Sequence, residues 1–397
     1  MNDILNITGI TDAAVFNGRN GDKVAHIPAE NEAVYTRALE ALTAAGFEKV
    51  AGYAEAGNLF STLSDKKTRI TAAYLPGCGR LELTTQEELN WSFETPYEGK
   101  VGASIFASSI SDRTFFVRMP DNSLVIIDGG WRIEDWMVTD RGKLLRMLIA
   151  EMQKITGCET VRVSLWIFTH PHFDHCNFIE NLHRYELADA LKVERILRNF
   201  PAEEYIPKSQ SIHPDTAACI GTDEAYVTEI EASLHRFGAD VITARAGMRL
   251  SICGVTFTVL TTPDENMPDI PSINGMSLVI RMEYCGSKVL WLGDMSDRMG
   301  ETVLTLYGDA IKSDAVQFSH HGWGGAGSFE FYETVGAKVQ LWTNSEWGFL
   351  MADKNQGYGK TKVATAVYDM PCCTRHIFCN RIKMEELALP IGEEHDR

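Results

Sequence analysis

The sequence predicts an α+β fold in which helices lie outside two β-rich halves, preceded by a smaller α+β segment. From about residue 100 onward, short β-branched runs separated by turns recur in two groups, with helical segments between them. Residues 1–95 carry a helical segment and strand-like runs of their own. A chain of 397 residues exceeds the usual size of one domain. We therefore expect an accessory segment over residues 1–95 and a larger unit over residues 96–397.

One amphipathic helix and three short strands define the accessory segment. Residues 31–46 place apolar side chains at helical spacing and end in Gly46, a helix stop signal. Strand-like runs follow at 58–62, 69–74 and 80–84, with a Pro-Gly turn before the last of them. The segment shows no group of catalytic or metal-binding side chains, so no function is predicted for it.

The larger unit is predicted from two groups of strands with helices interspersed. Its first group has strands at 102–110, 113–119, 123–128 and 161–169, and a helix at 143–155. Its second group has strands at 248–261, 277–283, 288–292 and 314–318. Two β-rich halves with helices outside them indicate a layered sandwich.

Composition and charge narrow the class of protein. The formal net charge of −17 disfavours binding to extended nucleic acid or anionic lipid, so we expect a small-molecule substrate. No apolar run reaches the 18 residues of a membrane-spanning helix, and no secretory signal is visible. Nine irregularly spaced cysteines fit free thiols in a reducing compartment. We expect a cytoplasmic protein with no membrane partner, and the oligomeric state is not indicated.

The most informative segment is 169–175 (THPHFDH), which carries three imidazoles and a carboxylate directly after a predicted strand. These groups suit Zn²⁺ and related divalent ions. On extended backbone, His170, His172 and Asp174 would share one side, because alternate residues point the same way. His175 would then point differently and serve a neighbouring ion. The segment predicts a metal site rather than a histidine-rich surface loop.

Three other predicted strands end in polar groups. Asp294 follows a strand and a glycine and could bridge two cations, although an aspartate there is more often a turn former. His320 and His321 follow another strand and fit a ligand or a loop histidine equally well. Asp128 precedes two glycines and could hold a ligating histidine by a hydrogen bond, or form an Asp-Gly turn. We expect these strand ends to converge on shared ions.

Taken in order, the segments DGG (128–130), HPHFDH (170–175), LGD (292–294) and SHHG (319–322) resemble the metallo-β-lactamase fold superfamily, whose hallmark is H-x-H-x-D-H. The resemblance covers about residues 100–350 and is greatest to the hydrolase domain of the ComEC/Rec2 competence branch. It implies a four-layer αββα sandwich that holds one or two divalent metal ions (zinc, manganese or iron) at one edge of its sheets.

The resemblance also implies a role for the residues of these motifs. The implied ligands are His170 and His172 for a first ion, Asp174, His175 and His320 for a second, and Asp294 as a bridge between the two. If the register is shifted by one residue, His321 replaces His320. Asp128 would accept a hydrogen bond from a ligating histidine.

One departure from the superfamily concerns the first ion. Members with a complete first site carry a histidine in a G-H-T-x-G segment before the strand that leads to the bridging aspartate. Residues 262–277 of this chain contain no histidine. Asn274 or a water would stand there, which would leave the first ion with fewer protein ligands.

The predicted activity is hydrolysis by a metal-activated water, since a divalent ion lowers the pKa of bound water from 15.7 to about 7. Asp174 would orient the hydroxide, and His321 or Asn274 would stabilise developing charge. Trp131 and Trp323 follow two of the strand ends and would line the mouth of the site, unless they pack in the core.

The substrate class is predicted only coarsely. The competence-branch resemblance favours a phosphoester or nucleotide-like small molecule. One alternative is an acyl hydrolase that cleaves a thioester, a lactone or a β-lactam. The other is a non-catalytic metal-binding interaction module.

Overall fold

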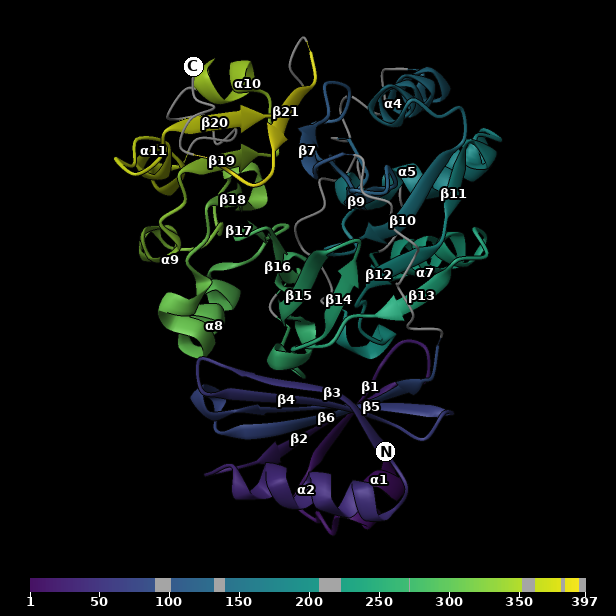
Figure 1. Cartoon of the computed structure of the whole chain (residues 1–397), viewed down its shortest axis with the longest axis vertical. Coiled ribbons are helices and arrows are strands. Elements are labelled where there is room, and N and C mark those ends of the chain that lie inside the picture. The colour runs from purple at the N-terminus through teal and green to yellow at the C-terminus, as the bar shows by residue number, and fades with distance from the viewer. Residues whose placement is uncertain are drawn as a thin grey trace.

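The computed structural model describes residues 1–89, 101–131, 140–206, 223–270, 272–351, 361–379 and 383–392. Figure 1 shows the N-terminal part at the bottom, as a layer of strands above two helices, and a larger body above it. The expected boundary near residue 95 lies outside the described residues, so the division into two units stays a prediction.

The N-terminal part is an antiparallel sheet with two helices on one face. Its six strands run in the order β1-β2-β6-β5-β4-β3. The elements are α1 (Asn2–Thr8), β1 (Ala14–Asn17), β2 (Lys23–Pro28), α2 (Ala33–Ala44), β3 (Glu48–Glu55), β4 (Asn58–Ser64), β5 (Thr68–Leu75), the 3-10 turn η1 (Pro76–Cys78) and β6 (Arg80–Glu87). The predicted helix and three strands of this part are confirmed as α2, β4, β5 and β6.

The faces of this sheet differ in what covers them. Helices α1 and α2 lie on the face that points away from the larger body (Figure 1), where Leu42 of α2 packs with Leu63 and Leu83 of the sheet. On the other face, Phe60 and Leu75 join an apolar cluster of the larger body. The central strands of the sheet are therefore covered on both faces, whereas the edge strands β1 and β3 are mostly exposed.

The larger body contains two sheets that face each other. The first sheet has the strand order β13-β12-β10-β9-β8-β7-β21, with β11 beside β10. Its strands are β7 (Ser104–Ala107), β8 (Phe115–Arg118), β9 (Leu124–Ile127), β10 (Val161–Ile167), β11 (Leu191–Val193), β12 (Arg195–Arg198), β13 (Asp240–Thr243) and β21 (Glu385–Ala388). The second sheet has the order β14-β15-β16-β17-β18-β19-β20. Its strands are β14 (Arg249–Ile252), β15 (Val255–Thr261), β16 (Val279–Tyr284), β17 (Ser287–Trp291), β18 (Ala315–Phe318), β19 (Val339–Trp342) and β20 (Arg375–Phe378).

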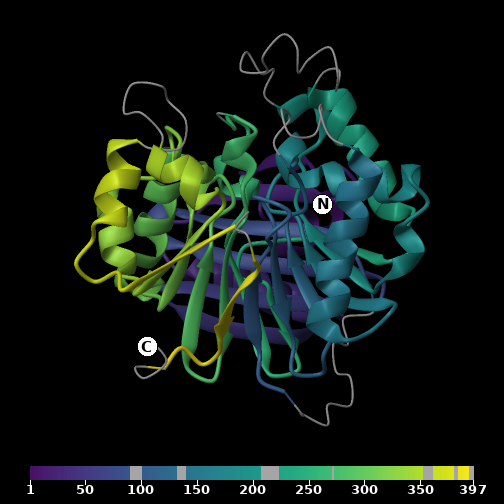
Figure 2. The same ribbon diagram turned by 90° about the horizontal axis from the view of Figure 1, so that it is seen from above.

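Helices complete the sandwich on its two outer faces. The view from above in Figure 2 shows the strands at the centre, with the blue and teal helices on one side and the green and yellow helices on the other. The first set is α4 (Arg141–Thr156), α5 (Phe173–Arg184) and α7 (Asp223–His235); the second is α8 (Asp297–Tyr307), α9 (Phe329–Val335), α10 (Glu346–Met351) and α11 (Lys362–Tyr368). The predicted α+β fold with four αββα layers is confirmed. Among the described residues, no helix is both long and apolar enough to cross a bilayer.

Apolar side chains fill the spaces between these layers. Leu165 and Ile167 of β10 pack against Val289 and Trp291 of β17 between the two sheets. Outside the first sheet, Trp166 of β10 belongs to the cluster that holds α4, α5 and α7. Alternation along β10 thus sends neighbouring side chains into two different cores, because successive residues of a strand point to opposite faces.

Strand direction brings several carboxyl ends to one edge of the sandwich. β9 and β10 are parallel in the first sheet, and β17, β18 and β19 are parallel in the second. The amide of Leu278, which precedes β16, donates to the carbonyl of Thr169 after β10, and this bond joins the two sheets at that edge. The residues after β9, β10, β17 and β18 are therefore close together.

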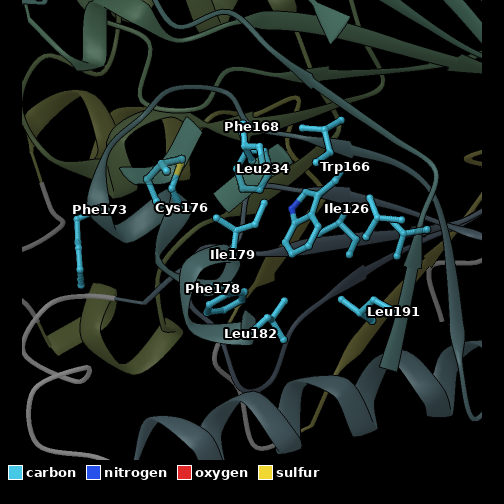
Figure 3. Close-up of a cluster of buried hydrophobic side chains, with 14 of the residues drawn as sticks. Ile126, Trp166, Phe168, Phe173, Cys176, Phe178, Ile179, Leu182, Leu191 and Leu234 are labelled. Atoms are coloured by element: carbon cyan, nitrogen blue, oxygen red, sulfur yellow. The ribbon is translucent and has the colours of Figure 1, made fainter. Parts of the chain in front are cut away.

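Helix α5 starts immediately after this edge and is held by its apolar side. Figure 3 shows Phe178, Ile179 and Leu182 of α5 in one cluster with Ile126 and Trp166 of the sheet. These side chains recur at helical spacing, which explains why the chain leaves the extended conformation here.

The start of α5 corrects one expectation about the histidine motif. The helix begins at Phe173, with His172 as its N-cap residue. His170 and Asp174 therefore do not share one side of an extended segment, as their spacing predicted. Instead, Asp174 and His175 lie in the first helical turn, where their side chains diverge by about 100°.

A buried polar network connects the N-terminal part to the larger body. Nη2 of Arg245 lies 3.1 Å from an Asp22 carboxylate oxygen, and Nη1 lies 2.7 Å from one of Asp264. Nη2 of Arg80 on β6 donates to the carbonyl of Glu265 at 2.9 Å. Asp264 and Glu265 belong to the 3-10 turn η4 (Pro263–Asn266), which follows β15 of the second sheet.

The Glu265 side chain of this network favours its protonated form. Burial raises its pKa well above the ordinary value, and the charges of Glu82 and Asp264 act in the same direction. The side chain also accepts a hydrogen bond from the amide of Thr262, which opposes the shift. In the native state Glu265 therefore holds a proton at pH values where the unfolded chain has lost it.

The free energy of unfolding should accordingly fall as the pH rises above the unfolded pKa of about 4.3, because the native state then binds more protons than the unfolded state. Replacement of Glu265 by Gln removes this loss of stability at high pH, because Gln does not ionise. The Gln side chain still has an oxygen that can accept the hydrogen bond from the amide of Thr262. We expect E265Q to raise the melting temperature by about 2–4 °C at pH 8 and to change it much less at pH 4. The exposed Glu87→Gln exchange on β6 is the control, and an equal shift at both pH values would contradict the assignment.

Candidate metal centre

Four segments that follow strands β9, β10, β17 and β18 place their polar side chains at one edge of the sandwich. Among the described residues, two groups of three have potential ligand atoms within 4.8 Å of one another. The first group is His170, His175 and Asp294, and the second is Asp174, His175 and His321. Both groups are drawn from the motifs that the sequence singled out, and they share His175.

The segment after β17 places Asp294 at the centre. Gly293 has a φ of 55°, and a Cβ at that position would lie 2.5 Å from Oγ1 of Thr169. Glycine is therefore required for the segments after β10 and β17 to approach each other. The amide of Asp294 donates to Oγ of Ser277 at 3.1 Å, and its side chain is 1% exposed.

Asp128 fixes the orientation of His175. Nδ1 of His175 lies 2.8 Å from Oδ2 of Asp128, and the same carboxylate accepts the amide of Thr169 at 2.7 Å. When the imidazole is neutral, Nδ1 donates to Asp128 and the lone pair is therefore on Nε2. That atom lies 3.2 Å from Oδ1 of Asp294 and 3.2 Å from Nε2 of His321. Asp128 thus binds the Nδ1 side of the histidine that both groups share, on the opposite side of the ring from its ligand atom Nε2.

The two adjacent histidines after β18 point in different directions. Both have left-handed backbone, with φ of 47° at His320 and 55° at His321. Nε2 of His321 lies 3.1 Å from Oδ2 of Asp294 and 3.4 Å from Oδ2 of Asp174. Nδ1 of His320 instead donates to the carbonyl of Gly324 at 2.7 Å. The geometry therefore favours the shifted register, with His321 in the place expected of His320.

Three other predicted site residues lie outside both groups. Nδ1 of His172 is 3.9 Å from Oδ1 of Asp174, and the His172 side chain is 31% exposed. Nδ2 of Asn274 lies 3.0 Å from Nε2 of His320, so these two residues contact each other. The roles of His172 and His320 as ligands and of Asn274 as a donor stay predictions.

The two tryptophans differ in their environment. Trp131 is 2% exposed, its ring centroid is 3.8 Å from that of Phe178, and its Nε1 donates to the carbonyl of Ile110. The expectation that Trp131 lines the mouth of the site is therefore wrong, because its ring completes the core around α5. The Trp323 ring is partly exposed and its centroid lies 6.3 Å from that of His321.

Sequence reasoning missed one charged residue in this region. Nε of Arg113, in the loop before β8, donates to Oδ2 of Asp174 at 3.0 Å. Its Nη1 lies 3.1 Å from Oδ2 of Asp112 and donates to the carbonyl of Thr343 at 2.8 Å. A single arginine at the edge of a predicted strand carries no motif, so only the fold could reveal this contact.

Burial and neighbouring charges set the protonation of the cluster. Burial acts to raise the pKa of Asp294, but the charges of His175 and His321 outweigh it and hold the pKa well below its ordinary value. Burial acts to lower the pKa of His175, but Asp294 and Asp128 raise it well above the ordinary value. For His170, burial and then the charge of His175 lower the pKa well below the ordinary value. These shifts favour the charged form of His175 and the neutral form of His170.

The side chains of the first group fit a divalent metal ion. Nε2 of His170 is buried and has no hydrogen-bond partner in the described part of the chain, and the oxygen of Asp294 nearest to it is 3.8 Å away. A buried polar atom without a partner is costly, and an ion between these residues would satisfy it. Two imidazole nitrogens and a carboxylate oxygen form a donor set suited to zinc, manganese or iron.

Comparisons with known proteins give likenesses in structure only. No family model matches the chain, and no curated protein matches it. Similar solved structures include the metallo-β-lactamase fold protein YhfI from Bacillus subtilis, at 12% identity and a TM-score of 0.41, over 72% of this chain and 100% of that one. Zn²⁺-bound PqqB from Methylobacterium extorquens has 12% identity and a TM-score of 0.37, over 70% and 87%.

The diiron β-hydroxylase CmlA from Streptomyces venezuelae has 15% identity and a TM-score of 0.40, over 73% of this chain and 55% of that one. At such identities and TM-scores, the chemistry of these proteins is not transferred to this chain. The likeness to the competence branch stays a prediction.

Loss of the Asp128 carboxylate should weaken metal binding. The exchange Asp128→Asn keeps the shape but no longer selects the His175 tautomer that exposes Nε2, so we expect the affinity for Zn²⁺ or Mn²⁺ to fall about 10–100-fold. Isothermal titration calorimetry on the full chain measures this change. Asp297→Asn is a matched control, because its side chain binds the amide of Gly327 and lies outside both groups. Equal affinities in D128N and the wild type would show that Asp128 does not orient a ligand.

Proposed function

We propose that this chain is a metal-dependent hydrolase whose most favoured substrates are phosphoesters or nucleotide-like small molecules. The observation that supports it is the convergence of His170 and His175, from the segment after β10, and Asp294, from the segment after β17, into one buried donor set. Structural histidines are normally satisfied by hydrogen bonds, whereas Nε2 of His170 is not satisfied by the described residues.

Each residue of the centre has a distinct part in this proposal. His170, His175 and Asp294 would hold a divalent ion. Such an ion, when bound, lowers the pKa of water and polarises the bond to be cleaved. Asp128 keeps the proton of His175 on Nδ1, so Nε2 stays available as a ligand.

Two further side chains are placed to act on water and substrate. Asp174 is 22% exposed and its Oδ2 is 3.4 Å from Nε2 of His321, so it can accept a hydrogen bond from a water molecule and orient it. Oδ1 of Asn274 is buried with no partner in the described part of the chain, and its Nδ2 contacts His320. In this proposal, Asn274 and His321 face the charge that develops on the substrate.

The choice of substrate class rests on surface chemistry. The partly exposed Trp323 beside His321 offers an aromatic face, on which a nucleobase or another flat group can stack. The net charge of −17 disfavours long nucleic acid and leaves small phosphoesters as the favoured class.

Removal of the Asp294 carboxylate tests the metal assignment. We expect D294A to lose bound metal and hydrolysis together, because Asp294 is the only carboxylate in the first group. Metal content by mass spectrometry and turnover of bis(p-nitrophenyl) phosphate are the measurements, and D297N is the control. Stoichiometric metal in D294A would refute the ligand assignment.

A panel of substrates tests the reaction class. The wild-type chain, supplied with Mn²⁺ or Zn²⁺, is assayed in parallel on bis(p-nitrophenyl) phosphate, a thioester, a lactone and a chromogenic cephalosporin. We expect the phosphodiester to be cleaved at the highest kcat/KM. Turnover of acyl substrates alone would assign the chain to the acyl hydrolases, and metal binding without any turnover would indicate an interaction module.

A further inference from the structure

The two candidate ligand groups compete for one atom. Both contain His175, whose Nδ1 is engaged by Asp128, so only Nε2 can bind a metal. An imidazole nitrogen has a single lone pair and therefore binds one ion at a time. The surroundings of the other ligands therefore determine in which group His175 binds the ion.

A fixed positive charge, the Arg113 guanidinium, is hydrogen-bonded directly to the second group, whereas Asp294 of the first group feels it only through space. Nε of Arg113 donates to Oδ2 of Asp174, the same oxygen that lies 3.4 Å from Nε2 of His321. An ion between Asp174 and His321 would have to share this oxygen with a guanidinium group. In the first group, Asp294 and His170 have no such hydrogen bond to an arginine among the described contacts.

The guanidinium cannot turn away from Asp174 easily. The Arg113 side chain is 1% exposed, and its Nη1 is held by the Asp112 carboxylate and by the carbonyl of Thr343. The same Thr343 carbonyl lies 3.0 Å from Nδ1 of His321. Burial leaves little water to screen the charge, and arginine keeps it at all relevant pH values.

We propose that Arg113 makes the two ion positions unequal: by holding Asp174, it limits the centre to one tightly bound divalent ion on the His170–His175–Asp294 side. Arg113 is a positioning residue, because it is buried and acts through Asp174. This inference rests on the proposed metal-dependent function and adds the number and place of the ions.

The test counts ions instead of measuring turnover. The double exchange D112N/R113Q removes the guanidinium together with its second partner carboxylate, so the net charge of the buried region is unchanged and Asp174 is released from Arg113. The full chain is loaded with Zn²⁺ or Mn²⁺, and retained metal is counted by mass spectrometry after gel filtration; calorimetry gives the affinity of each step. We expect one retained ion in the wild type, and a second step at least about tenfold tighter in D112N/R113Q.

Three further variants separate this effect from a loss of folding. R113K keeps the positive charge and should keep the wild-type count of one. R198Q/E231Q removes another buried arginine–carboxylate pair, whose described contacts include no residue of either ligand group, and should also keep one. D174N should retain the single ion within a few-fold of the wild-type affinity, and this result does not depend on whether D112N/R113Q folds.

Several outcomes would overturn the proposal. Two equally tight ions in the wild type, an unchanged second step in a folded D112N/R113Q chain, or loss of the single ion in D174N would each do so. These results leave the proposed hydrolase function standing. Absence of any bound ion in the wild type would overturn that function as well.

Discussion

The candidate centre depends on the close approach of the loop after β9 to the start of α5. A Cβ at Gly130 would overlap the backbone carbonyl of Asp174, so only glycine allows the two segments to touch. The amide of Gly129 donates to the carbonyl of His175 at 2.6 Å, and the amide of Phe178 donates to the carbonyl of Gly129 at 3.0 Å. This close approach brings the Asp128 carboxylate within hydrogen-bond distance of Nδ1 of His175.

Packing of α5 holds the approach in place. Phe178 and Ile179 belong to the same apolar cluster as Trp131, which follows the Asp-Gly-Gly segment directly. The indole that was expected at the mouth of the site therefore has a structural role, because it closes the core beneath the loop. A substrate-facing Trp131 would have removed one of the contacts that position Asp128.

The sequence predicted that the four strand ends would meet because their polar motifs occur together in one order, whereas each motif alone also fits a turn or a loop. It could not predict which of His320 and His321 turns inward, since this depends on the left-handed backbone of both residues. It also misjudged the geometry of the HPHFDH segment, because helical spacing from Phe173 onward outweighed the extended pattern of the histidines. Arg113 was missed because its partner Asp174 is 61 residues away in the sequence.

We propose that one divalent ion binds to His170, His175 and Asp294, and anomalous diffraction from crystals soaked with Zn²⁺ would locate such an ion directly. We predict a strong peak about 2.0–2.2 Å from Nε2 of His170, Nε2 of His175 and an oxygen of Asp294. A soaked crystal with its strongest peak bound by other residues, or with none of these three side chains at bonding distance, would contradict the assignment.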